Sequence, residues 1–481
     1  MNLKVIAYVM SRIQFAVSLA LCIPLLAALY WQEASVLDFL GTLLISLCLA
    51  VFLEINGSLE HESLTLREGI AITGLSWCLQ TVVAAIPFFA GHYLGVIDSV
   101  FEGVSGLTCT GASVIQDLDV IPRSLILWRG IMHWIGGLGI VVIFIALFPQ
   151  PGSGIMKMFE AETTGPAAER VVPRIRDTAN ALLMIYLFFT VVMIGMLLLC
   201  KMSLFDAVNI AFSSVATGGF ATRNSSIADY NNLPAEIVII FFMLLGSGNF
   251  GLYFIAWRKG FGRLVQNLEF RVFWLIYIVI TALITINLTE AMGMDSGDSL
   301  RYAAFQMASI ISTTGLSTHN FDTWPAFSQY CIILLMLMGG CAGSTSGGLK
   351  VSRIIILCKM VGKIIQEKLH PHSIARVTMS SQQQSDVVVF RVARCFMLYI
   401  VIAIVAAMFF NFDGLPVVDS IMLVLSCMGN VGVAFGVAYT FYDLPDITKV
   451  VCCFCMIIGR LEIFTFLAML QPGFWRQNSN W

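Results

Sequence analysis

The sequence predicts an all-α integral membrane protein in which four parallel helix–pore loop–helix repeats surround one pore within a single chain, after two N-terminal transmembrane helices. Three observations predict this fold, with about ten spanning helices and four re-entrant loops. Of the 481 residues, 58% are hydrophobic and 12% are charged, against about 45–50% and about 25% in a soluble domain. Apolar runs of about 20 residues, long enough to cross a bilayer, recur along the chain. A short pattern that contains a glycine occurs four times between these runs.

Residues 1–60 are expected to form the two leading transmembrane helices, with the N-terminus in the cytoplasm. Lys4 and Arg12 lie ahead of or at the start of the first apolar run, as they would in a signal peptide. No small-residue cleavage site follows, and a second apolar run begins near Val36. Both runs are therefore interpreted as retained helices.

Charge and cysteine content exclude other classes of protein. The formal net charge of −2 leaves no large basic surface, so nucleic acid is not an expected partner. Most of the 13 cysteines lie inside apolar runs, where free core cysteine is the expected state. The cluster Cys452, Cys453 and Cys455 has no distant CxxC or histidine partner, which argues against a metal site there.

Each of the four repeats places a glycine after small or hydroxyl-bearing residues. The four stretches are Thr108 to Ala112, Ala216 to Phe220, Ser312 to Leu316 and Gly429 to Val433. Asp98, Asp206 and Asp419 stand thirteen residues before their glycines, and Tyr302 takes that place in the third repeat. An aspartate N-cap predicts a short helix of about three turns, which cannot span a bilayer. The chain must then return as a re-entrant loop, tolerated where its backbone is buried in protein or lines a wet cavity.

The positions of basic residues predict the boundaries and the orientation of the repeats. The expected repeats are residues 65–150, 175–262, 268–368 and 386–476. Lys and Arg gather in the connections between them, which are therefore expected to be cytoplasmic. The opposite segments carry mainly acidic residues, among them Asp98 and Glu102. We interpret these as an acidic outer mouth that raises the local concentration of cations.

Glycine loops at the ends of short helices suit the passage of a monovalent cation. Rings of backbone carbonyls can replace the hydration shell of such an ion, and glycine adopts the unusual backbone angles that this requires. Four helix C-termini add partial negative charge. One glycine alone would indicate a tight helix contact or an ordinary turn, but four in register favour a pore. The predicted filter residues are Thr110, Gly111, Gly218, Gly219, Thr314, Gly315, Val431 and Gly432.

A second glycine-rich stretch falls in the middle of the expected second spanning helix of the third repeat. Five glycines lie between residues 339 and 348, and each costs a helix interior about 1 kcal/mol, so this helix is predicted to break. The break is interpreted as a gate below the filter, with a passive kink as the alternative. The predicted gate residues are Gly339, Gly340, Gly343, Ser344, Thr345, Ser346, Gly347, Gly348 and Lys350.

Two basic residues carry alternative interpretations. Lys350 could contact the gate or a regulatory partner, or it could extend to the cytoplasmic interface. Arg460 lies within the last apolar helix, where a charge is expensive unless it faces water or a partner. It is interpreted as a pore charge below the filter that weakens cation binding and permits exit. The alternative is a structural pair with a carboxylate or a helix end.

Four motifs carry a family resemblance over essentially the whole chain. They are HWIGGLG at 133–139, GSGNF at 246–250, GGCAGSTSGGLK at 339–350 and GRLE at 459–462. With the two leading helices, these motifs make the chain similar to the TrkH/TrkG branch of the Trk/Ktr/HKT potassium transporter superfamily.

The resemblance implies potassium uptake across the cell membrane, with K+ as the transported ion and no organic cofactor in this chain. It implies a filter glycine in each loop, an intramembrane gate loop at 339–350 and an arginine at 460. Some sodium-preferring plant relatives carry a serine where this chain has Gly111. Cys109 departs from the threonine frequent in relatives, and its side chain is expected behind the filter. The resemblance also implies a homodimer with one pore per subunit and a cytoplasmic TrkA-type nucleotide-binding regulatory ring.

Three rival functions stay open from the sequence. A proton- or sodium-coupled symporter could use the same scaffold, although the membrane potential alone supplies about 2.3 kcal/mol per charge per 100 mV. A transporter of organic solutes would usually have inverted repeats, whereas these four run in the same direction. A membrane enzyme would need clustered acid, base or metal ligands, and none is evident in the sequence, so catalysis is not expected.

Overall fold

The computed structural model describes residues 1–58, 65–139, 175–371, 376–379, 382–434, 436, 440–461 and 463–475. Its secondary structure is helical except for one small β-ribbon, β1 (Thr378–Met379) with β2 (Gln382–Gln383). In the described residues, six helices are long and apolar enough to span a membrane, or up to eight if each of two bent helix pairs is one span. The predicted ends of the first repeat, at residue 150, and of the fourth, at residue 476, lie outside the described residues.

The chain begins with two long helices and continues through four repeats. The leading pair is α1 (Leu3–Trp31) and α2 (Val36–Ile55). Repeat one contains α3 (Leu66–Ala90), α4 (Val96–Leu107) and α5 (Arg123–Leu138). Repeat two contains α8 (Ile175–Leu199), α9 (Leu204–Val215), η1 (Ala228–Tyr230), α10 (Leu233–Gly246) and α11 (Phe250–Lys259), and α12 (Gly262–Gln266) follows it.

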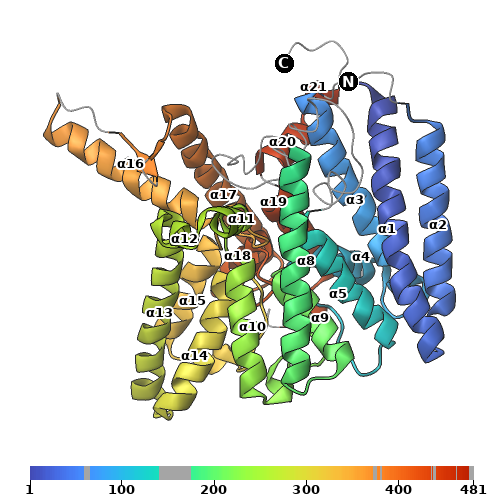
Figure 1. The fold of residues 1–481 in the computed structure, drawn as a ribbon, viewed down its shortest axis with the longest axis horizontal. Helices are drawn as coiled ribbons and strands as arrows, with labels where there is room; N and C mark the ends of the chain where they lie inside the picture. The colour runs from blue at the N-terminus through green and yellow to red at the C-terminus, as the bar shows by residue number, and fades with distance from the viewer. Residues whose placement is uncertain are drawn as a thin grey trace.

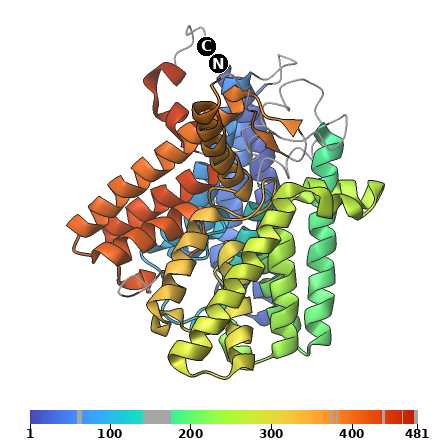
Figure 2. The same cartoon turned by 90° about the vertical axis from the view of Figure 1, so that its left-hand side faces the viewer.

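The last two repeats follow the same order. Repeat three contains α13 (Leu268–Met292), α14 (Ser296–Ile311), η2 (Phe321–Thr323), α15 (Ala326–Met338) and α16 (Val351–Leu369). Repeat four contains α17 (Asp386–Phe412), α18 (Val417–Gly429), η4 (Phe441–Asp443), α19 (Asp446–Leu461) and α20 (Ile463–Leu470), and α21 (Pro472–Trp475) follows. Figure 1 shows α16 extending from the body at the end where the N-terminus and α21 lie. Figure 2 shows the orange to red helices of repeat four beside the green to yellow ones of repeats two and three.

The short helices α4, α9, α14 and α18 close a ring of repeats. Each packs against the two long helices of its own repeat, and each also packs against the second helix of the repeat before it. These cross-repeat contacts are α19 with α4, α5 with α9, α10 with α14 and α15 with α18. Two of them carry an ion pair, Lys449 to Asp98 at 2.7 Å and Arg301 to Glu236 at 2.6 Å. The fourth repeat thus packs against the first, which closes the ring.

The aspartates in front of the glycines do not cap these helices, so that prediction was wrong. Asp98, Asp206 and Asp419 each lie in the first turn, and the capping positions are Gly95, Ser203 and Pro416. A carboxylate in the first turn still stabilises a helix through the helix dipole. Helix α14 begins one turn earlier than the others, with Asp295 as its cap and Asp298 in its first turn. This earlier start explains why Tyr302 stands where the other repeats have aspartate.

Polar contacts at three levels attach the leading helix pair to repeat one. At one end, the Asn2 amide donates to Glu68 at 2.7 Å. In the middle, Gln14 joins Ser46 of α2 and Gln80 of α3 within a buried network. At the other end, the Glu33 carboxylate accepts from the amides of Arg123 and Ser124, the first residues of α5. The hairpin therefore caps and positions α5, whose own N-cap residue, Pro122, makes no capping side-chain bond.

We expect Glu33→Ala to destabilise the protein by about 1 kcal/mol, because an N-cap carboxylate that serves orphan amides contributes about that much. The measurement is the thermal unfolding midpoint in detergent. Glu54→Ala is the matched control, since Glu54 pairs with Arg12 at a partly exposed position and solvent-accessible pairs contribute at most about 1 kcal/mol, often nothing. Equal midpoints for the Glu33 variant and the parent would show that the cap is dispensable.

Candidate functional site

The loops that follow the four short helices meet one another in a closed cycle. A side-chain carbon placed on the glycine of any loop would overlap a carbonyl oxygen of the next loop, and the fourth loop contacts the first in the same way. The distances from this added carbon to the oxygen are 2.2 Å for Gly111 and Gly218, 2.1 Å for Gly219 and Thr314, 2.1 Å for Gly315 and Val431, and 1.9 Å for Gly432 and Thr110. All eight residues predicted for the filter are thus brought together in one ring. Only glycine can occupy Gly111, Gly219, Gly315 and Gly432, because any side chain there would overlap the next loop.

The four loops share one backbone conformation. In each loop the glycine has a φ between +77° and +98°, and the residue two positions earlier also has a positive φ, between +52° and +58°. The amide of the intervening residue bonds to the carbonyl of a serine five positions back, which is the Schellman ending of a helix. These bonds are Thr110 to Ser105, Gly218 to Ser213, Thr314 to Ser309 and Val431 to Ser426, at 2.7 to 3.0 Å. The repeats therefore match in backbone as well as in sequence.

A non-glycine residue takes the left-handed position in each loop, and its side chain fastens the loop. L-residues avoid this conformation at a cost of roughly 1 kcal/mol, so a compensating contact is expected. Cys109 donates to the His133 oxygen at 3.3 Å, which places its thiol on α5, behind the ring. Asn430 donates to the Met456 oxygen at 3.0 Å and to the Thr110 hydroxyl at 2.9 Å.

The other two left-handed residues bond to the glycine-rich segment of repeat three. The Thr217 hydroxyl lies 3.2 Å from that of Thr345, and the Thr313 hydroxyl accepts from the Gly347 amide at 2.8 Å. A side-chain carbon on Gly347 would lie 2.3 Å from the Gly429 oxygen at the end of α18. The segment therefore lies directly against the bases of three of the four loops.

The predicted break in the second helix of repeat three is confirmed. Helix α15 ends at Met338 and α16 begins at Val351, so residues 339–350 form a non-helical segment, hereafter the gate segment. The bend between α10 and α11, which measures 92°, packs against it. Ser247 accepts from the Cys341 amide at 2.8 Å, and the Phe250 amide donates to Gly343 at 3.2 Å. Backbone amides and carbonyls left without helical partners at the two breaks thus hydrogen-bond to one another.

Glu269, which the sequence analysis missed, holds both ends of the gate segment. One of its oxygens accepts from the Ala342 amide at 2.7 Å and from the Ser352 amide at 3.1 Å. Glu269 is buried in the first turn of α13. The only signal in the sequence was an acidic residue at the start of an apolar helix. Acidic residues are common in the first turn of helices, so this signal did not single out Glu269.

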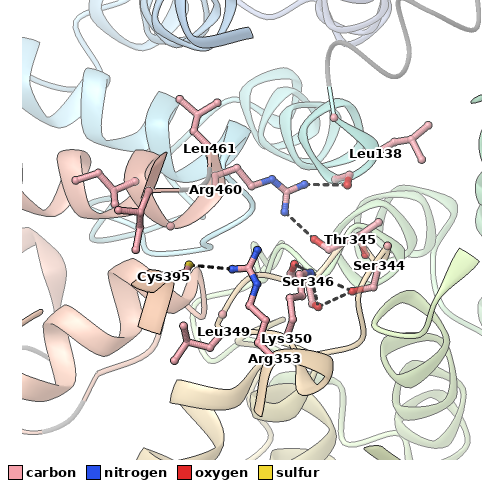
Figure 3. A pocket seen from close by; sticks show the side chains of 18 of the residues that line it. Leu138, Ser344, Thr345, Ser346, Leu349, Lys350, Arg353, Cys395, Arg460 and Leu461 are labelled. Atoms are coloured by element: carbon pink, nitrogen blue, oxygen red, sulfur yellow. Dashed lines mark hydrogen bonds between the residues drawn. The ribbon is translucent and has the colours of Figure 1, made fainter. Parts of the chain in front are cut away.

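Both basic residues that the sequence left open bond to the gate segment, Lys350 from within it and Arg460 from α19 (Figure 3). Lys350 is buried and donates to the Ser346 oxygen at 2.5 Å, so it does not extend to the interface. Arg460 donates to the Thr345 oxygen at 2.7 Å and to the oxygens of Gly136 and Gly137 at 2.6 and 2.8 Å. These contacts surround a cavity of about 100 Å³ between α5, α19 and the gate segment. The side chain of Glu462, in the same motif, lies outside the described residues.

The outer side differs from the expected acidic mouth at one residue. Glu102 is fully buried and forms an ion pair with Arg129 of α5 at 2.7 Å, so it does not face the outer solution. Asp117, by contrast, is exposed, and hydrogen bonds from Asn224 and from the Asp119 amide lower the pKa of its carboxyl. Asn224 also accepts from the Leu118 amide at 2.8 Å, which links the loops that follow α4 and α9 in repeats one and two.

Comparisons with known proteins agree on one family. The model of the TrkH family, described as a cation transport protein, matches residues 38–472. A relative named Trk system potassium uptake protein TrkG, from Escherichia coli strain K12, is 32% identical and covers 99% of both chains. One named TrkH, from Halomonas elongata, is 31% identical over 99% of this chain and 100% of its own. The crystal structure of the potassium transporter TrkH from Vibrio parahaemolyticus matches with a TM-score of 0.90 and 29% identity, covering 99% and 100% of the two chains.

Asn430 allows the cost of the left-handed conformation to be separated from the value of the side-chain bonds. Asn430→Gly and Asn430→Ala both lose the two side-chain bonds. Asn430→Gly still adopts the left-handed backbone angles easily, whereas in Asn430→Ala these angles are also strained. We expect both variants to unfold at lower temperature than the parent, and alanine to be worse than glycine by about 1 kcal/mol. Thermal unfolding in detergent measures this. Equal stability of the two variants would mean that the loop carries no strain at this residue.

Proposed function

This chain belongs to the TrkH family of cation transport proteins, and on that premise we propose that it takes up potassium across the cell membrane through the ring of loop carbonyls. The observation that carries the proposal is the closed cycle in which each loop glycine contacts a carbonyl oxygen of the next loop. Such a ring can substitute for the water around a bare cation without placing a formal charge in the pore. The names of the relatives, Trk system potassium uptake proteins, support potassium as the ion.

The filter in this proposal is formed by the backbone of four loops. The oxygens of Thr110, Gly218, Thr314 and Val431 provide one layer of ligands, and the helices behind them direct their negative ends toward the same place. Gly111 stands where some sodium-preferring plant relatives carry a serine, so the resemblance supports potassium over sodium. The anchored left-handed residues keep the spacing of the oxygens constant, which favours one ion size.

The gate in this proposal is the segment 339–350. It lies against the filter loops through Thr313 and Thr217, so a cation that leaves the filter meets it next. Opening requires it to move away and to break contacts with Glu269 and Arg460. Arg460 thus restrains the segment, and its charge also weakens cation binding below the filter.

Assembly and regulation complete the proposal. Helix α16 extends from the body and exposes apolar side chains near its end, including Ile365 and Leu369. We assign this end, together with the N-terminus, to the cytoplasm, because the basic connections lie there. A homodimer and a TrkA-type nucleotide-binding ring are the partners, and this ring acts on the gate segment through α16. Driven by the membrane potential, uptake is channel-like and needs no coupled ion.

Expression in a cell that lacks potassium uptake tests the proposal. We expect growth at low potassium with the parent chain, and loss of discrimination against sodium with Gly315→Ser, because an added side chain would overlap the Val431 oxygen at 2.1 Å. Gly293→Ser is the control, since open space surrounds that glycine. Identical behaviour of the parent and Gly315→Ser would remove Gly315 from the filter. In liposomes, a reversal potential that shifts with pH or sodium at constant potassium would favour the symporter.

Arg460→Gln tests the gate. The change removes the bond to the Thr345 oxygen and the positive charge, so we expect a higher unstimulated potassium flux into liposomes than the parent shows. Arg258→Gln is the matched control, because Arg258 lies at the end of α11 and contacts Phe254 instead of the gate segment. A flux equal to or below that of the parent, from well-folded protein, would show that Arg460 does not restrain the gate.

A further inference from the structure

A buried cluster of polar side chains stands behind the loops of repeats one and two, on the outer side of the ring. Its centre is the ion pair between Arg129 of α5 and Glu102 of α4, in which the guanidinium Nε lies 2.7 Å from a carboxylate oxygen. Arg129 is 2% exposed and Glu102 is not exposed at all. His133 lies one turn along α5 from Arg129. We refer to Glu102, Arg129 and His133 as the buttress.

The buttress binds the first loop just beyond its filter glycine. Ser113, two residues after Gly111, donates to Glu102 at 3.1 Å and accepts from Arg129 at 3.0 Å. The amide of Val114 donates to the second Glu102 oxygen at 3.2 Å. Both groups of the ion pair are therefore used to fix the backbone that follows Gly111.

The buttress also binds the second loop at the residue next to its filter glycine. The Phe220 amide donates to the His133 Nε2 at 3.1 Å. Because Nε2 accepts, Nδ1 carries the proton, which it donates to the Gly106 oxygen at 2.7 Å. The guanidinium of Arg129 lies 3.9 Å above the Phe220 ring and 3.4 Å from the Ala221 oxygen. One helix, α5, thus fixes the loops of two repeats.

The fold of the short helix does not require these charges. At the place of Glu102, nine residues before the glycine, the other repeats have Ile210, Gln306 and Leu423, and their helices end in the same Schellman turn. A buried ion pair is in general no more stabilising than apolar residues of similar size. We therefore expect this ion pair to fix the positions of particular atoms. With His133, it holds the backbone beside the filter glycines of two adjacent loops.

We propose that Arg129, held by Glu102 and acting with His133, is a positioning residue that sets the spacing of the first two filter loops and thereby the preference for potassium over sodium. This inference rests on the proposed function, because it assumes that the ring of loop carbonyls is the filter. Loss of the buttress lets the first and second loops move closer together, so that the ring also accepts a smaller ion. The overall fold and the gate are not involved.

The test uses the double variant Glu102→Gln with Arg129→Gln, which leaves no unpaired buried charge and so is able to fold. Glu236→Gln with Arg301→Gln is the matched control, because it neutralises another Arg–Glu ion pair between a short helix and a second helix, at the far end of α14 from the glycine. Full-length protein is placed in liposomes, and the sodium-to-potassium permeability ratio is measured from reversal potentials.

We expect the buttress variant to raise the sodium-to-potassium permeability ratio by about fivefold, the factor that corresponds to one net hydrogen bond, while the control pair keeps the ratio of the parent. An unchanged ratio in folded buttress variant overturns the proposal, and so does an equal change in the control pair. If the buttress variant does not fold, Arg129→Lys is tested instead. Lysine keeps the positive charge but lacks the guanidinium fork that reaches Ser113 and Ala221, so we expect a raised ratio. An unchanged ratio in this variant also overturns the proposal. A parent chain that conducts no potassium would instead refute the proposed function.

Discussion

The structure depends on one close approach, that of a glycine in each loop to a carbonyl oxygen of the next. Four such contacts close into a cycle, and none leaves room for a Cβ atom. To reach this arrangement, each short helix must end abruptly and turn its chain through a left-handed residue. The long helices, the cross-repeat packing and the ion pairs between repeats hold the four helix ends at the required separation.

The left-handed residues connect this ring to the rest of the molecule. They are not glycines, so they bring side chains to a position that would otherwise have none. Cys109 and Asn430 fasten their loops to the second helices of their own repeats. Thr217 and Thr313 instead bond to the gate segment. In the proposed function, this difference makes two of the four loops sensitive to the position of the gate, and leaves the other two attached to fixed helices.

Several charged side chains inside the bundle contact backbone groups that are not in regular helix. Arg460 bonds to oxygens at the end of α5 and in the gate segment. Glu269 accepts from one amide within that segment and from one just after it, and Glu102 accepts from the backbone beyond Gly111. Broken helices and loops expose polar groups that cannot remain unpaired in a membrane. A buried charge satisfies several of them at once, which explains why these costly residues occur where the backbone is irregular.

Local pattern was sufficient to predict the membrane class, the four repeats, the short helices, the positions of the glycines and the break after Met338, because each depends on composition or spacing within a short window. It was not sufficient for features that depend on partners distant in the sequence. In the sequence alone, Glu102 is typical of a surface carboxylate, and only the fold places Arg129 beside it. Lys350 is likewise typical of a membrane interface, and only the fold places the Ser346 oxygen near its amine. Nothing in the sequence around Glu269 indicates its two amide partners. Residue type and spacing limit the conformations that each backbone segment can adopt. Which distant groups meet depends on the packing of the bundle, because burial and pairing exist only once the helices are assembled.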